Sequence, residues 1–208
     1  MRKPFSAALL TLSAAALALG VSAASASAAT AVTWSVSPGG SISGAAGTTT
    51  LTDTSSGLAI SCKTSTLTGT LKKGTGLKGA SLGTVTNVAF NNCSVDGLTL
   101  SISSGAVKWP LNAVSYKSGK TTGTITKIHV SISSSECSAV IDGTGGSAHN
   151  GKVKITYVNS THKLSILPTG GNLHVWDVNG CLGAVSNGDS GTIKSTYAIT
   201  PAQTITGS

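Results

Sequence analysis

Arginine is almost absent from this chain, and acidic residues are few. The only arginine is Arg2, the other basic residues are lysines, and six acids are spread over 208 residues. Because arginine is the preferred side chain for bidentate recognition of phosphates and bases, its absence argues against a nucleic-acid partner. Charged residues are only 10%, and the chain contains many β-branched residues, with Val and Ile as core formers. This composition is typical of a folded chain rather than a disordered one.

Aromatic residues and metal-binding spacings are also scarce. Aromatics make up 4% of the chain, too few for the aromatic-lined cleft that secreted glycosidases usually have. The cysteines show no C-x2-C spacing, and the histidines form neither H-x-H nor H-E-x-x-H. The sequence therefore predicts no metal site and no cofactor, and only spatial convergence would bring histidines together. The histidines are His129, His149, His162 and His174.

The N-terminus has the pattern of a secretory signal peptide. Arg2 and Lys3 precede a short apolar run from Ala7 to Val21, and Ala26-Ser27-Ala28 fits a cleavage site. We expect residues 1–28 to be a helical signal peptide and the mature chain to begin near Ala29. The mature chain would carry 12 lysines against six acids, a net charge of +6. It should be secreted, and its cationic surface favours association with anionic cell-surface polymers.

Apolar and polar residues alternate with a period of two over most of residues 29–208. Leu98, Leu100 and Ile102 alternate with Thr and Ser, and similar runs recur along the chain. We find no apolar pattern with a helical period outside the signal peptide. The prediction is a single all-β domain, an antiparallel β-sandwich or irregular barrel. Trp109-Pro110 predicts an edge strand, because proline cannot donate to a ladder.

The sequence contains an apparent internal repeat with a period of about 40 residues. GTVTNVAF, GTITKIHV and GNLHVWDV begin at Gly83, Gly123 and Gly171, and a cysteine follows each copy. In the first two copies, Val85 and Ile125 do not fit the period-two alternation that Val88 and Ile128 follow. A β-bulge after the Gly-Thr start would restore the phase.

Gly188 to Gly191 spells GDSG, the sequence around the nucleophile of chymotrypsin-like proteases. Gly191 also begins a G-x-[VI]-K stretch that recurs at Gly105 and Gly151, so Asp189 and Ser190 are expected in a turn. His149 is followed by asparagine instead of the cysteine usual beside a protease histidine. We therefore interpret GDSG as coincidental and predict no catalytic residues and no enzyme activity.

Four cysteines in an exported chain predict two disulfides. Neighbouring strands usually lie side by side, which favours Cys62–Cys93 and Cys137–Cys181. If the cysteines of successive repeats are equivalent, Cys93–Cys137 with Cys62–Cys181 is the alternative.

Two further features are candidate contact sites. Lys72, Lys73 and Lys78 lie in the glycine-rich loop TLKKGTGLKGAS, either as a solvated turn or as a polyanion contact. Val175 and Trp176 are both apolar and lie on opposite faces of their expected strand, and we favour a core position for Trp176 over ligand stacking.

Three features carry a resemblance to known proteins: an expected strand ending in Cys62, FNNCS at Phe90 to Ser94, and VKWPLNA. In these features the chain resembles a group of uncharacterised small secreted actinobacterial proteins. More distantly, it resembles the exported family of alkane oxidation activators. Where those proteins read L-P-W, this chain has Val107 to Pro110. The resemblance implies an extracellular, surface-associated and non-enzymatic role, with no catalytic motif to carry over.

We therefore expect a secreted, disulfide-stabilised β protein with a binding or structural role at the cell surface. The alternative is a small-ligand carrier like the secreted apoproteins that hold antibiotic chromophores. A hydrolase is the least favoured class.

Overall fold

The computed structural model describes residues 32–105, 108–146 and 148–208, and these residues form an all-β structure, which confirms the predicted fold class. The predicted signal peptide, residues 1–28, lies outside the described residues. Within the described ranges no helix has the length and apolar character needed to cross a bilayer. The strands are β1 (Thr33–Ser37), β2 (Gly40–Ala46), β3 (Thr49–Asp53), β4 (Ala59–Leu71), β5 (Gly74–Lys78), β6 (Gly83–Val95), β7 (Leu98–Ser103), β8 (Trp109–Lys117), β9 (Lys120–Ile128), β10 (Val130–Ser133), β11 (Ser138–Asp142), β12 (Gly151–Val158), β13 (Lys163–Leu167), β14 (Leu173–Asn179), β15 (Ser190–Thr200) and β16 (Thr204–Gly207).

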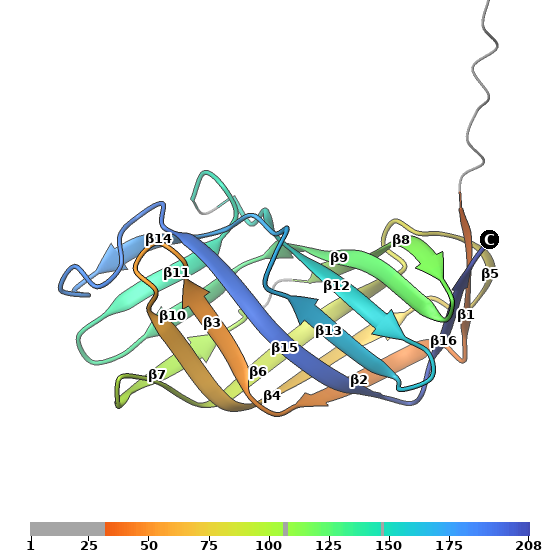
Figure 1. Cartoon of the computed structure of the whole chain (residues 1–208), viewed down its shortest axis with the longest axis horizontal. Coiled ribbons are helices and arrows are strands. Elements are labelled where there is room, and N and C mark those ends of the chain that lie inside the picture. The colour runs from red at the N-terminus through yellow and green to blue at the C-terminus, as the bar shows by residue number, and fades with distance from the viewer. Residues whose placement is uncertain (1–31, 106–107, 147) are drawn as a thin grey trace, which may run out of the picture. The chain divides into compact units, whose positions relative to one another are not determined.

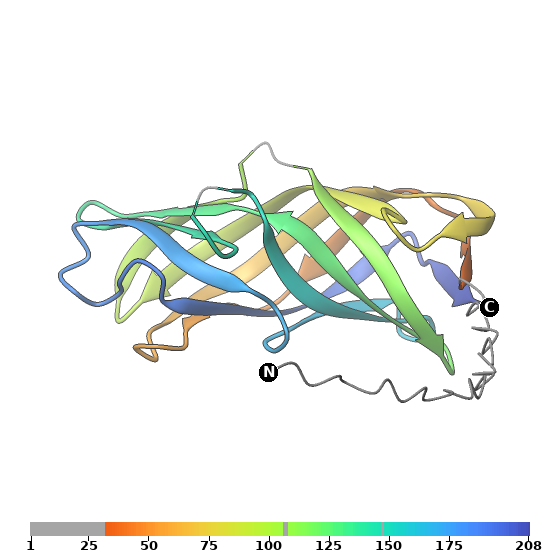
Figure 2. The same ribbon diagram turned by 90° about the horizontal axis from the view of Figure 1, so that it is seen from above.

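The main sheet closes on itself, which selects the irregular barrel over the sandwich. Strands β4, β6 and β15 run without interruption, whereas five other positions are each filled by two consecutive strands: β2/β3, β7/β8, β9/β10, β11/β12 and β13/β14. Each position pairs antiparallel with the next along the chain, and β15 pairs back with β2 and β3. The three continuous and five composite positions therefore make an eight-stranded up-and-down barrel (Figures 1 and 2).

The predicted β-bulges are confirmed in both strands. The register of β6 against β4 shifts after Val85, and that of β9 against β12 shifts beside Ile128. Lys127, the extra residue in β9, has a φ of 61°. The bulges let Val85 and Val88 both face the interior, and Ile125 and Ile128 likewise, so all four are buried.

The three predicted repeat copies begin on alternate barrel positions. Gly83 starts β6, Gly123 lies within β9, and Gly171 precedes β14. A spacing of about 40 residues thus corresponds to one antiparallel pair of barrel strands. The internal repeat itself stays a prediction.

The prediction that Trp109-Pro110 lies in an edge strand is wrong. Strand β8 pairs with β9 on one side and with β6 on the other, where Pro110 lies opposite Thr84. A closed barrel has no free edge, and the pairing with β6 covers three positions only, so one missing N–H donor is tolerated.

A buried hydroxyl cluster lies among the apolar side chains of the interior. Ser195 shares the inward face of β15 with apolar neighbours, and its Oγ lies 2.7 Å from Thr49 Oγ1. Thr49 Oγ1 lies 2.6 Å from Ser65 Oγ, which donates to Tyr197 Oη at 3.0 Å. Each hydroxyl of this cluster thus has a hydrogen-bond partner, as buried polar groups require.

The two ends of the barrel differ. The small sheet β16–β1–β5 lies at one end, and its Trp34 is 1% exposed (Figure 1). The interior beside it is nearly filled, with a cavity of about 30 Å³ lined by Ile42, Leu111, Ile205 and neighbours. Strands β3, β7, β10, β11 and β14 form the opposite end, where packing leaves far more space.

Candidate functional site

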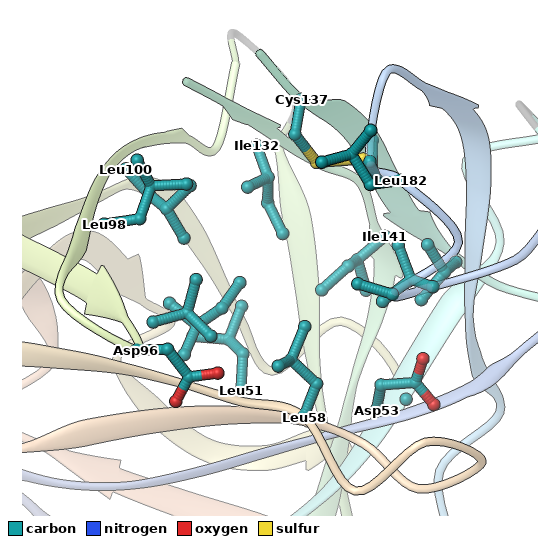
Figure 3. A pocket seen from close by; sticks show the side chains of 18 of the residues that line it. Leu51, Asp53, Leu58, Asp96, Leu98, Leu100, Ile132, Cys137, Ile141 and Leu182 are labelled. Atoms are coloured by element: carbon teal, nitrogen blue, oxygen red, sulfur yellow. A yellow bond between two sulfur atoms is a disulfide. The ribbon is translucent and has the colours of Figure 1, made fainter. Parts of the chain in front are cut away.

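An apolar pocket of about 260 Å³ opens at the end of the barrel formed by β3, β7, β10, β11 and β14. Its walls include Leu51, Leu100, Ile132, Ala139 and Ile141, whose side chains surround the space shown in Figure 3. An apolar cavity of ~150 Å³ is large enough to hold benzene, so this pocket has room for a larger apolar body. The mouth of a small barrel is also a common place for a ligand.

Strand alternation largely decides which residues reach this pocket. On β11, Ala139 and Ile141 line the pocket, whereas the intervening Val140 does not. On β3, the buried Leu51 and Asp53 line it, and the intervening Thr52 also reaches it. Successive side chains of a strand point to opposite faces, so on β11 one face supplies the wall.

Exposed leucines flank the mouth of the pocket. Leu98 is 42% exposed and Leu182 is 95% exposed, and both line the pocket. Leu182 follows Cys181, whose disulfide to Cys137 also lies in the pocket wall (Figure 3). The disulfide therefore ties the connection that carries Leu182 to the start of β11. Large apolar side chains left in water around a cavity are typical of a binding site.

The charged residues of the pocket are all acidic. Asp53, Asp96 and Glu136 line it, half of the six acids in the chain, and no lysine or histidine of the described residues joins them. Asp53 is only 7% exposed. Its Oδ1 accepts from the backbone N–H groups of Ser55 and Ser56, whereas its buried Oδ2 has no hydrogen-bond partner among the described residues. The pocket thus combines apolar walls with negative charge in a chain that is basic overall.

The structure contains the disulfides Cys62–Cys93 and Cys137–Cys181. This is the short-range pairing that chain order favoured. Cys62 and Cys93 lie directly opposite each other in the β4–β6 ladder, both almost fully buried.

The lysines proposed as polyanion contacts lie away from the pocket. Lys72 and Lys73 occupy the turn after β4, Lys78 ends β5, and all three are exposed. The loop expected there contains strand β5, which pairs with β1 at the filled end of the barrel. The polyanion contact stays a prediction.

Trp176 lies neither in the core nor in the pocket. It is half-buried on the outer face of β14, and its Nε1–H donates to the Gly143 carbonyl at 2.8 Å. The core position that we favoured for Trp176 is wrong, because its neighbours Val175 and Leu173 fill the inward face instead. Ligand stacking by Trp176 stays a prediction.

Ser190 of GDSG was expected in the turn, but it is the first residue of β15 and lies opposite His174 in the β14–β15 ladder, because strand pairing begins one residue before Gly191. His174 Nδ1 donates to the Gly188 carbonyl at 3.0 Å. In a catalytic triad, this nitrogen would donate to a carboxylate instead. Among the described residues no hydrogen bond joins the Ser190 hydroxyl to a histidine. Ser190 is held through its backbone, by Thr54 Oγ1 and Ser55 Oγ.

Sequence reasoning missed two groupings: the apolar pocket, and a cluster of His129, Asp142 and His149. His129 lies between β9 and β10 with its side chain 18% exposed. The pocket depends on pairing between strands far apart in the sequence, and the cluster depends on the register of β10 with β11 and of β9 with β12. Within the local sequence, the pocket is indicated only by acids and leucines that lie near turns.

Comparisons with protein-family models, with curated proteins and with solved structures found no match to this chain. The resemblance to alkane oxidation activators therefore stays an expectation, and the functional argument depends on the pocket itself.

Proposed function

We propose that this protein is a non-enzymatic extracellular binding protein whose barrel mouth holds a small apolar ligand that carries a positive charge. The observation that carries the proposal is the apolar cavity of about 260 Å³, open at one end of the barrel. Eight-stranded barrels are wide enough to hold one small ligand. The two disulfides suit the oxidising space outside the cell.

The acids of the pocket favour a cationic ligand group. The Asp53 carboxylate lies at the end of the inward face of β3, and its Oδ2 is free to accept a hydrogen bond. An ammonium group supplies both the donor and the compensating charge, whereas a carboxylate ligand would face repulsion from three acids.

Three probes of equal chain length test the proposal: octylamine, octanol and octanoate, each titrated by calorimetry. We expect octylamine to bind about fivefold more tightly than octanol, which corresponds to about 1 kcal/mol, because the cost of removing water from the ammonium group offsets part of its attraction to Asp53. Octanoate should bind most weakly. Asp53→Asn should remove the preference for the amine and change the octanol affinity by less than about twofold. Asp189→Asn, an acid outside the pocket, is the matched control and should change neither affinity.

The outcomes separate the two parts of the proposal. Equal affinity for octylamine and octanoate would contradict the cationic part and leave the apolar site in place. No binding of any of the three probes would contradict the binding function itself. Ala139→Phe, which fills the pocket from one wall, should abolish binding of octanol as well as octylamine.

A further inference from the structure

Three side chains with metal-ligating atoms meet where two neighbouring barrel positions are both interrupted. His129 lies between β9 and β10, Asp142 ends β11, and His149 lies in the connection from β11 to β12. One nitrogen of each imidazole and one carboxylate oxygen all lie within 4.8 Å of one another. The two ring centroids are 4.1 Å apart. Asp142 follows the pocket-lining Ile141, so strand alternation places this cluster on the outer side of the barrel wall, separate from the pocket.

Asp142 is fully buried and its carboxylate is saturated with hydrogen bonds. Its Oδ1 accepts from the backbone N–H groups of Gly143 and Asn150 in the following connection and of Gly151, the first residue of β12. Its Oδ2 accepts from the His149 backbone N–H at 3.0 Å and lies 2.9 Å from His129 Nδ1. Four backbone N–H groups and the His129 imidazole thus surround the carboxylate, a set of donors that suits its ionised, acceptor-only form.

An ionised Asp142 fixes the state of the neighbouring imidazole. The carboxylate can only accept, so His129 must donate through Nδ1–H, and in the neutral ring this leaves the lone pair on Nε2. This carboxylate–histidine arrangement is the one that commonly orients a metal-ligating histidine. His149 is exposed and the His129 side chain is 18% exposed, so an ion and its water ligands can reach both rings.

We propose that His129 Nε2 and a ring nitrogen of His149 bind one divalent transition-metal ion of the zinc, nickel or copper class, with Asp142 as the positioning residue behind His129. Neutral imidazole is a preferred ligand for these ions. The remaining coordination positions are filled by water. The bound ion would join the β11–β12 connection to the β9–β10 junction. This metal site does not depend on whether the pocket binds a ligand.

Zinc titration of the purified protein tests the site. Calorimetry should give one Zn²⁺ per chain, and imidazole ¹H–¹⁵N spectra should shift for His129 and His149 while His162 and His174 stay unchanged. In the metal-free protein at mildly alkaline pH, the ¹⁵N shifts should show His129 protonated on Nδ1, a readout of the positioning role that stability alone would not move. A proton on Nε2 instead would contradict that role.

Single histidine substitutions complete the test. His129→Gln and His149→Gln should each weaken zinc binding at least about tenfold, whereas the matched control His174→Gln should leave it unchanged. Both variants keep Asp142 and its backbone hydrogen bonds, and thermal unfolding without zinc checks that they are folded. Equal zinc affinity in all variants, or shifts spread over all four histidines, would overturn the proposal.

Discussion

The two disulfides close loops of similar length but lie in different places, so removing each one separates stability from function. Cys62–Cys93 joins adjacent positions of the β4–β6 ladder, and neither cysteine lines the pocket. Cys137 and Cys181 both line it and tether the connection that carries Leu182. The perturbation is each pair changed to alanine: Cys62→Ala with Cys93→Ala, and Cys137→Ala with Cys181→Ala.

The chain-entropy relation gives nearly equal losses of stability. A separation of 31 residues for Cys62–Cys93 gives about 3.7 kcal/mol, and a separation of 44 for Cys137–Cys181 gives about 4.0 kcal/mol. The effects on the pocket should differ. Without its tether, the connection around Leu182 gains conformational freedom that a ligand must remove on binding, so we expect octylamine affinity to fall about tenfold. The Cys62–Cys93 variant should stay within about threefold of the parent.

The assays are urea unfolding and octylamine calorimetry on both variants under conditions where they remain folded. Similar losses of free energy of unfolding, with weaker binding in the Cys137–Cys181 variant alone, are the expected result. Equal losses of binding in both variants would refute the idea that the tether organises the pocket mouth.

Two further predictions concern residues away from the pocket. Ser190→Ala should change the free energy of unfolding by less than about 0.5 kcal/mol, because the described hydrogen bonds of Ser190 are made by its backbone; labelling of Ser190 by a fluorophosphonate probe would contradict the non-catalytic reading. Burial raises the pKa of Tyr157, although the hydrogen bond to the Gln203 carbonyl acts in the opposite direction. The contribution of Tyr157 to stability is therefore complete below the unfolded pKa of about 10, and it is lost as pH rises through the folded pKa. Tyr157→Phe should remove that alkaline decline in urea-unfolding free energy, and an unchanged decline would contradict the assignment.

Much of the fold follows from local sequence pattern. The alternation of Val153, Ile155 and Tyr157 predicts β12 and its hairpin to β13, because a half-buried strand needs only a period of two. The breaks in the period-two alternation of the repeated strands likewise predict the two bulges, because an extra residue is needed to bring both apolar side chains to the inward face. The choice between sandwich and barrel could not be made this way, because it depends on β15 pairing with β2 and β3 at the far end of the chain.

The candidate sites were harder to predict. Leu51, Leu100 and Ile141 read as ordinary core residues, and nothing local indicates which end of the barrel their side chains leave unfilled. His129 and His149 come together because two adjacent barrel positions are interrupted at the same level. Those interruptions follow from strand register, which the histidine spacing does not encode.

The most direct test of the central claim is a crystal structure of the protein with octylamine bound. We predict that the octyl chain lies between Leu100, Ile132 and Ile141, with the ammonium group within hydrogen-bond distance of Asp53 Oδ2. An empty pocket in crystals saturated with octylamine, or an octyl chain bound only elsewhere on the protein, would contradict the account.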